Sequence, residues 1–153
     1  MKVLPLLSIT LALAACAVAP SKLSGLTSPA EAVQAANGNP NGGARGTFAL
    51  TVNEIGVTGK RIFLDSAANY HDHDNLAITM SHQMARQVAN CLGMSIANLK
   101  YRRIVVHGVA KRVRIYFVRG GKYTGKYYYQ TWVRVTSPTQ ISFAKRMPTV
   151  RCS

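Results

Sequence analysis

Acidic side chains are scarce in this sequence. Its 153 residues include only 5 aspartates and glutamates against 19 lysines and arginines, which gives a formal net charge of +14 at pH 7. The last carboxylate side chain is Asp74, so no basic residue after it has an acidic neighbour in sequence. Such a distribution creates a positive potential around the protein. We therefore expect an anionic partner; a basic surface without a ligand is the alternative.

Long apolar runs are also lacking. The one continuously apolar stretch lies at residues 3–13, and about eleven residues are too few to cross a bilayer as a helix. Once a signal and a tether are set aside, roughly 100 residues remain for folding. We therefore expect one compact domain rather than two.

The N-terminal residues have the pattern of an export signal. Lys2 supplies a positive charge, residues 3–13 an apolar segment, and Leu-Ala-Ala at residues 13–15 small residues before Cys16. This pattern resembles the lipobox of bacterial lipoproteins, in which the cysteine is acylated and the signal is cut before it. The resemblance implies a lipoprotein signal peptide at residues 1–15 and lipidation of Cys16, palmitate included. An ordinary secretory signal is the alternative.

The lipobox resemblance also implies a location. Two or three acyl chains on Cys16 would anchor the protein stably in a lipid bilayer, at about 0.8 kcal/mol per buried methylene. Ala17 follows, and lipoproteins of bacteria with two membranes commonly go to the outer membrane when this residue is not Asp. We expect a membrane-anchored protein of the cell envelope, in the outer membrane and facing the periplasm or the surface if the host has two membranes.

Small and polar residues dominate the next segment. Residues 17–46 are mostly Ala, Gly, Asn, Ser and Pro, so we expect residues 16–46 to be a lipidated cysteine and a flexible linker. A short helix over Ser-Pro-Ala-Glu-Ala-Val-Gln-Ala-Ala is the alternative for part of it, although such a helix is marginal alone in water. The folded domain is then expected at residues 47–153, with a basic C-terminal tail.

Alternating apolar residues predict a mainly β domain. Phe48, Leu50 and Val52 alternate with polar or small neighbours, which is typical of a strand with one buried face. The same alternation predicts four more strands, at residues 62–64, 76–80, 104–118 and 127–136.

One helix interrupts the strands. Ser81 is suited to cap it, apolar residues recur at three- and four-residue spacing as far as Leu92, and Gly93 is a plausible end. The helix therefore separates the third predicted strand from the fourth. Within the fourth strand, Gly108 predicts a bulge or a bend.

Three strands, a helix and two strands follow one another in the order of an OB-fold, a Greek-key barrel of five strands. Three segments carry a more particular likeness: Gly-Lys-Arg-Ile-Phe-Leu-Asp from residue 59, Arg-Arg-Ile-Val-Val-His-Gly-Val from residue 102, and Ser-Pro-Thr-Gln-Ile from residue 137. The chain resembles small bacterial OB-fold domains of secreted and lipid-anchored proteins over residues 47–142. This implies a five-stranded OB-fold-like Greek-key barrel with one helix between strands 3 and 4, and no particular activity.

Basic and aromatic residues gather around the last two predicted strands. OB-folds usually bind along strands two and three and through the loops between strands one and two and between strands four and five. Lysines and arginines attract phosphate chains, and exposed rings stack on bases at about 1 to 3 kcal/mol per base. The alternative is that alternate tyrosines face the core. The residues assigned to anion or nucleic-acid binding are Arg112, Arg114, Tyr116, Arg119, Lys122, Tyr123, Lys126 and Tyr128.

The sequence offers little for metal binding. Residues 71–74, His-Asp-His-Asp, concentrate two imidazoles and two carboxylates, but zinc usually requires a third or fourth fixed ligand. His82 and His107 are the nearest candidates, and only the fold could bring them close. We expect a structural turn here, with no metal and no cofactor.

An enzyme is the least supported hypothesis. The secreted thermonucleases are OB-folds that use carboxylates and arginines around calcium, and part of their site lies in the second half of the barrel. A degenerate nuclease in this chain would depend on Asp65, Asp72 and Asp74 alone. No serine, cysteine or histidine stands in a recognisable nucleophile setting. We therefore expect no enzymatic activity.

Two cysteines remain if Cys16 is acylated. An oxidising envelope compartment favours a disulfide between Cys91 and Cys152, and a closed loop of about 60 residues would stabilise the fold by roughly 4 kcal/mol. Two unrelated thiols are the alternative.

These patterns together predict a non-enzymatic envelope lipoprotein. Its basic OB-like face would meet an anionic polymer or an envelope protein, as a subunit of an envelope assembly. A surface-tethered protein that binds single-stranded nucleic acid is the alternative, because the same charges attract any polyanion.

Overall fold

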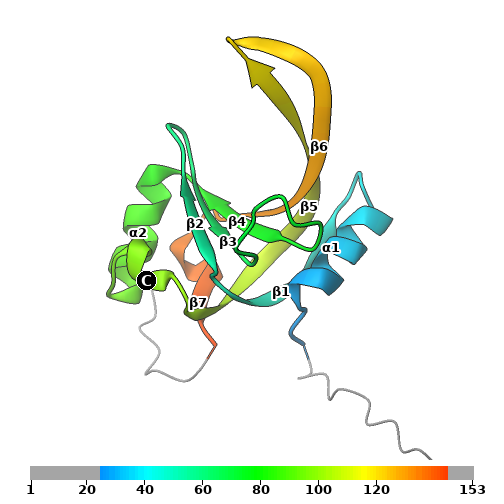
Figure 1. Cartoon of the computed structure of the whole chain (residues 1–153). Coiled ribbons are helices and arrows are strands. Elements are labelled where there is room, and N and C mark those ends of the chain that lie inside the picture. Colours follow the sequence, from blue (N-terminus) through cyan, green and yellow to red (C-terminus); the bar gives the residue numbers. More distant parts are fainter. Residues whose placement is uncertain (1–24, 145–153) are drawn as a thin grey trace, which may run out of the picture.

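The computed structural model describes residues 25–144 (Figure 1). The predicted mainly β fold is confirmed. The elements in chain order are α1 (Pro29–Gly38), β1 (Ala44–Thr51), β2 (Glu54–Val57), β3 (Ile62–Asp65), β4 (Leu76–Met80), α2 (His82–Leu92), the 3-10 helix η1 (Ile96–Leu99), β5 (Arg103–Arg119), β6 (Lys122–Arg134), the 3-10 helix η2 (Pro138–Gln140) and β7 (Ile141–Phe143). No helix among these residues is long and apolar enough to cross a membrane. The predicted signal peptide, Cys16 and Cys152 lie outside the described residues.

The strands form one mixed sheet, and the pairings among the described residues do not close it into a barrel. Seven strands lie in the order β1-β5-β6-β4-β3-β2, with β7 paired to β5, and this path is open at both ends. All pairs are antiparallel except β4 and β6. The sequence missed β2 and β7 because each is short and largely half-buried, so neither has an alternating run of useful length. The predicted helix is α2, between β4 and β5.

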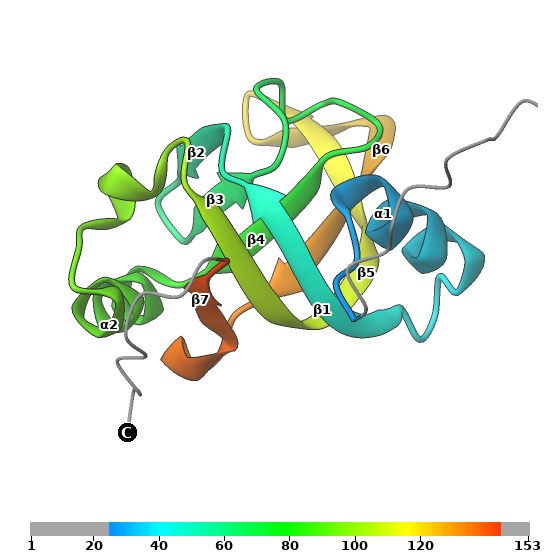
Figure 2. The same ribbon diagram turned by 90° about the horizontal axis from the view of Figure 1, so that it is seen from below.

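The core takes most of its strand residues, at alternate positions, from β1, β4 and β5. Phe48, Leu50 and Val52 are 1%, 2% and 0% exposed, as the alternation predicts. All five residues of β4 are buried, because this strand lies between β3 and β6 and is covered on both faces. Figure 2 shows α1 and α2 at opposite ends of the sheet. The hydrophobic effect that stabilises the domain is therefore concentrated around β1, β4 and the first half of β5.

Residues 29–46 belong to the folded domain, so the predicted linker is wrong for this part. Ser28 caps α1 in a capping box with Glu31. Ala32 and Ala36 are fully buried, and the helix contacts β1, β4, β5 and β6. The helix is the alternative that the sequence offered for this segment, and its small alanines allow it to lie close to the sheet. Tertiary packing then stabilises what would be marginal in isolation.

The second helix agrees with its prediction. The Ser81 hydroxyl accepts a hydrogen bond from the backbone N–H of Met84, and Gly93 ends the helix with a left-handed φ of 68°. Cys91, on this helix, is disulfide-bonded. Both other cysteines lie beyond the described part of the chain, so the pairing with Cys152 stays a prediction.

The sequence predicted a bulge or a bend at Gly108, and the strand pairing shows no bulge there. Gly108 pairs in regular register with Gly46 of β1. A Cβ atom at residue 108 would lie 2.8 Å from Cγ1 of Val133, so the glycine is required by a close approach of β6. The one irregularity of β5 lies between Tyr116 and Val118.

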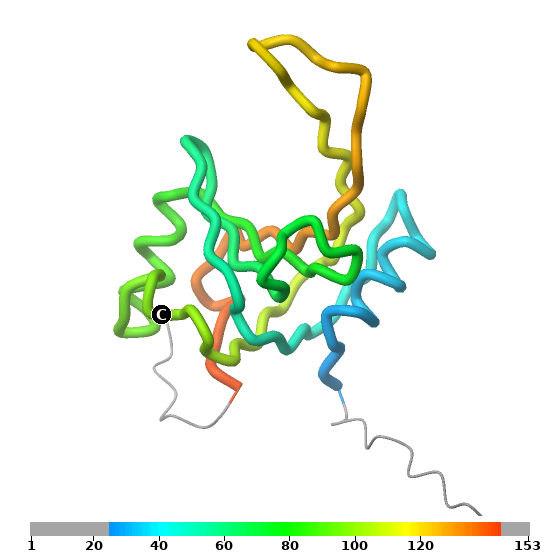
Figure 3. The backbone as a smooth tube through the Cα atoms, in the orientation of Figure 1, coloured from blue at the N-terminus to red at the C-terminus, as the bar shows by residue number. Residues whose placement is uncertain are grey.

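The last two long strands extend beyond the rest of the sheet as a two-stranded ribbon, residues 111–130, which we name the arm (Figures 1 and 3). Ala110 is the last residue of β5 that pairs with β1, and Thr131 is the first residue of β6 beside β4. Between these points β5 and β6 pair only with each other. The strand β6 begins at Lys122, so residues 122–126 of the predicted loop belong to a strand.

Candidate anion-binding arm

Strand register determines the two faces of the arm. On β5 the side chains of Ile104, Val106 and Ala110 point into the core of the body. Period two carries Arg112 and Arg114 onto the same side of the strand, where no core lies beneath them. We name this side the arginine face. Its members, from both strands, are Arg112, Arg114, Tyr116, Tyr123, Tyr127 and Tyr129.

Both arginines of this face are held by tyrosine rings. The guanidinium carbon of Arg112 lies 3.5 Å from the ring centroid of Tyr129, and that of Arg114 lies 4.8 Å from the ring centroid of Tyr127. Arg114 also donates from Nη1 to the hydroxyl of Tyr116 at 3.3 Å and from Nη2 to that of Tyr129 at 3.0 Å. Cation–π contacts and hydrogen bonds thus fix two positive charges side by side.

The contacts of Arg114 also favour its charged form. The hydrogen bonds from Arg114, first to the Tyr116 hydroxyl and then to that of Tyr129, raise the pKa of its guanidinium above the ordinary value. Residues 111–130 contain no Asp or Glu. The arginines therefore have tyrosines as neighbours along the arm, and no carboxylate of the arm neutralises them.

A hollow of about 360 Å³ lies at the root of the arginine face. One wall consists of Arg112, Arg114, Tyr116 and Tyr129 from the arm. The other wall is the turn between α1 and β1, which supplies Pro40 and Asn41. The sequence could not predict this second wall, because it lies in the segment expected to be a linker.

The opposite face of the arm is more apolar. Tyr128, which the sequence assigned to the binding set, lies on this face, where its ring contacts those of Phe117 and His71 at centroid distances of 5.1 Å and 5.0 Å. Burial, more than any other factor, raises the pKa of its phenol. The register separates Tyr128 from Arg112 and Arg114, so it serves packing against the loop between β3 and β4.

Four predicted binding residues surround the end of the arm. Gly120 and Gly121, with φ values of 58° and 76°, make the turn there. Tyr123 is 76% exposed, and its ring meets the edge of Tyr116. The cationic side chains of the group are all exposed: Arg119, Lys122 and Lys126.

A second cationic surface, which the sequence did not predict, lies on the outer face of the sheet. Two hollows of about 350 Å³ and 440 Å³ share Thr79, Arg134 and Thr136 as lining residues. The larger one includes Trp132, whose ring lies 5.3 Å from the guanidinium carbon of Arg61. The other basic residues around the two hollows are Arg45, Lys60 and Lys111. Finding this surface requires the pairing of β4 with β6, which no local pattern encodes.

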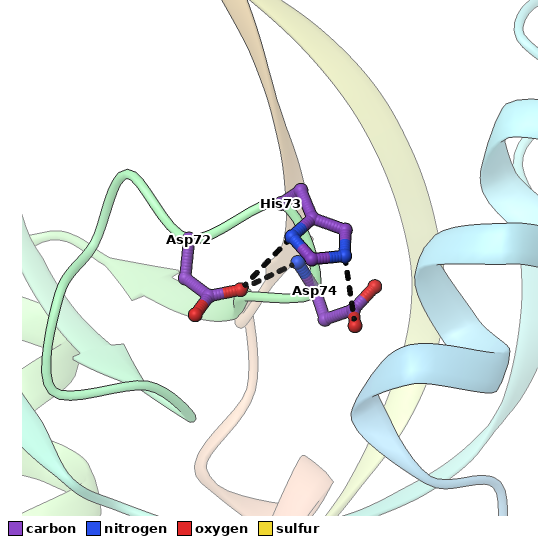
Figure 4. Close-up of side chains that lie close together, drawn as sticks. All are labelled: Asp72, His73 and Asp74. Carbon is purple, nitrogen blue, oxygen red and sulfur yellow. Dashed lines mark hydrogen bonds and ion pairs between the residues drawn. The ribbon is translucent and has the colours of Figure 1, made fainter.

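The His-Asp-His-Asp segment forms an exposed turn (Figure 4). Nδ1 of His73 lies 3.5 Å from Asp72 Oδ1, and its Nε2 lies 3.2 Å from Asp74 Oδ2. The backbone N–H of Asp74 donates to the Asp72 carboxylate, as in an Asx turn. Within the described residues, the candidate metal ligands here are these three exposed side chains, so His82 and His107 do not complete a site.

Asp65 stands apart from that turn. It is 4% exposed, and its Oδ1 accepts a hydrogen bond from Asn75 at 2.8 Å. Burial raises the pKa of its carboxyl group; the hydrogen bond from Asn75 opposes this shift, and the nearby Glu54 adds to it. The three aspartates that a nuclease would need are therefore divided between the interior and an exposed loop.

Comparison with known proteins assigns no family to the chain. No protein-family model matches it, and no curated protein matches its sequence.

Proposed function

We propose that this protein is a non-enzymatic binding module of the cell envelope that holds an anionic partner on the arginine face of its arm. One observation carries the proposal: Arg112 and Arg114 are fixed side by side on tyrosines, in an arm without carboxylates. No carboxylate of the arm forms a salt bridge with these two guanidinium groups. Their free N–H groups remain available to acceptors of a partner.

The fixed geometry favours binding over a merely basic surface. An arginine in solution loses side-chain entropy when a ligand immobilises it, whereas a guanidinium that already stacks on a ring loses less. Tyrosine and arginine are also the side chains most enriched among residues that dominate binding energies at interfaces. An acidic envelope polymer or an acidic face of an envelope protein fits this surface.

The proposed envelope location rests on the lipobox resemblance, with Cys16 acylated and inserted in a bilayer. The arm extends from the side of the body opposite to the start of the described chain (Figure 1). A partner in the envelope, either a polymer or a protein of an assembly, fits this location.

We also propose an OB-like arrangement of the strands. Val52 and Asn53 alone separate β1 from β2, the two ends of the strand order. The backbone N–H of Val52 donates to Arg102 and that of Asn53 donates to Asp65, so this junction is bonded to both sides. If β1 and β2 are counted as one bent strand, this strand pairs with β5 at one end and with β3 at the other. The sheet is then a five-stranded Greek-key barrel with α2 between its third and fourth strands.

Single-stranded nucleic acid is the second candidate partner. The outer-face hollows favour it, because they set Trp132 among Arg61, Lys111 and Arg134. The exposed tyrosines of the arm offer further rings on which bases stack. Affinity for an oligonucleotide that exceeds affinity for acidic envelope polymers would make this the leading function.

A salt titration tests the proposed function. Fluorescently labelled lipopolysaccharide and a labelled oligothymidylate are titrated with the full-length chain between 50 and 300 mM salt, about the range in which polyanion affinity changes steeply. The double variant Arg112→Ala, Arg114→Ala should weaken binding and lower the salt slope by about 2. The matched control, Arg86→Ala with Arg102→Ala, removes two exposed charges from the body. Equal losses in both variants would reject the arm as the site.

The location has its own test. Labelled palmitate should enter the wild-type protein and fail to enter the Cys16→Ser variant. Palmitate in neither protein would reject the lipid anchor and leave the binding proposal for the arm in place.

A further inference from the structure

Several side chains with hydrogen-bond donors line the hollow at the root of the arm. Arg112 and Arg114 line it from the arm, and Asn41 lines it from the turn between α1 and β1. The hollow measures about 360 Å³, which is ample for a small oxyanion. Residues of the α1–β1 turn and of the arm thus converge from two directions on one space.

The tyrosine hydroxyls add to these donors. The hydroxyls of Tyr116 and Tyr129 accept hydrogen bonds from Arg114 at 3.3 Å and 3.0 Å. A phenol that accepts one hydrogen bond keeps its own proton to donate. Both tyrosines line the hollow. Arg114 therefore orients two hydroxyl donors as well as presenting its own remaining N–H groups.

One donor in this group has no partner. The Nε–H of Arg112 is buried and makes no hydrogen bond to any described residue. Its guanidinium stacks closely on Tyr129, at 3.5 Å from the ring centroid. A buried donor without an acceptor destabilises a protein. This Nε–H is too buried to meet a ligand, so the terminal N–H groups of Arg112 are the ones that an acceptor in the hollow would use.

We propose that this hollow is a binding site for a phosphate group, formed by Arg112, Arg114, Asn41 and the hydroxyls of Tyr116 and Tyr129. The inference deepens the proposed function and rests on it, since it names the chemistry that the arginine face recognises. A phosphate is tetrahedral and offers several acceptor oxygens, which suits donors that converge from two walls. A carboxylate offers two oxygens in one plane, and arginine pairs with either group through its planar fork.

The phosphate group could belong to a phosphomonoester of an envelope glycolipid or to the diester of a nucleic acid. Isothermal titration of the full-length chain with inorganic phosphate, glucosamine 6-phosphate and dimethyl phosphate separates these sources. Sulfate and acetate are measured in parallel at the same ionic strength. We expect saturable binding of phosphate, tighter than that of acetate by tenfold or more, and the ester that binds better identifies the source.

Two variants test the geometry rather than the charge. Arg112→Lys keeps the positive charge but loses the planar fork, and should weaken phosphate binding at least tenfold. Asn41→Ala, in the opposite wall, should weaken it several-fold. Arg86→Lys is the matched control, since it makes the same exchange at an exposed position of α2, and should leave phosphate affinity unchanged.

The outcomes separate this inference from the function on which it rests. If lipopolysaccharide or oligonucleotide binding depends on Arg112 and Arg114 while inorganic phosphate does not bind, the phosphate site is wrong and the binding arm stands. If phosphate, sulfate and acetate bind equally, the hollow is a general anion site and the inference fails. If neither polymer nor phosphate binds, both proposals fall.

Discussion

The same two strands form part of the body and the whole of the arm, and they behave differently in the two regions. One side of β5 buries Ile104 and Val106 where α1, β1 and the rest of the sheet cover it. Beyond Ala110 the same side carries Arg112 and Arg114, and the cover is gone. Alternation along a strand defines two faces, and the neighbouring elements decide whether a face becomes core or binding surface.

The body and the arm therefore have different roles, the body in stability and the arm in binding. The body holds the fully buried apolar side chains and therefore most of the free energy of folding. The arm holds large exposed side chains, among them Tyr123 and Val118 at 76% and 57% exposure. Stability should respond to substitutions in the body, and binding should respond to substitutions in the arm. The predictions below set matched changes in the two regions against this division.

The largest effect is expected from the loss of a core aromatic ring. Phe48→Ala should lower the free energy of unfolding by about 3–5 kcal/mol, because the side chain is 1% exposed and leaves a cavity. Tyr123→Ala removes a ring of the arm and should change it by less than about 0.5 kcal/mol. Chemical denaturation followed by circular dichroism measures both. Similar losses in the two variants would mean that the arm is part of the cooperative core.

A smaller effect is expected at Gly108. In Gly108→Ala the new methyl group would lie 2.8 Å from Val133 Cγ1, so the variant should lose about 1–3 kcal/mol of stability. Gly38→Ala is the control, since a Cβ there meets no atom within 4 Å. Denaturation midpoints of the two variants should move apart. An unchanged midpoint in Gly108→Ala would show that β6 shifts easily at this crossing.

A change at the N-cap of α1 tests whether this helix unfolds together with the body. Ser28→Ala removes the side-chain oxygen that accepts from Glu31, and should cost about 1 kcal/mol if α1 unfolds together with the body. The exposed Ser142→Ala should have no measurable effect. If hydrogen exchange of α1 in the Ser28 variant rises while global stability stays constant, α1 is an independent segment rather than part of the body.

Local patterns predicted the elements whose signals are local. The alternation of Phe48 with Leu50 predicted a strand, and Ser81 with Gly93 predicted the limits of α2, because capping and periodicity act within a few residues. The helix α1 was only the alternative to a linker, since its burial depends on the close approach of Ala32 to a sheet formed by distant segments.

The sequence predicted the part of the candidate site that depends on local alternation, and no more. The alternation placed Arg112, Arg114 and Tyr116 on one face, and the structure agrees. The position of Tyr128 depended on where the hairpin turns, which the pair Gly120 and Gly121 could have indicated. The second wall of the hollow and the outer-face hollows required tertiary contacts that no local pattern contains.

The smallest predicted effect is a change in the pH dependence of stability. It concerns the body alone, because the body buries one carboxyl group and the arm has none. Burial raises the pKa of Asp65 in the folded protein, so its protonated form contributes stability that is present at low pH and is lost as pH rises through that pKa. Asp65→Asn remains neutral and keeps an acceptor for Asn75. The difference in Tm between the variant and the wild type should therefore change in favour of the variant, by a few degrees at most, as pH rises from about 4 to 7. Parallel curves for Asp65→Asn and the wild type would mean that the carboxyl group ionises in the folded body without cost.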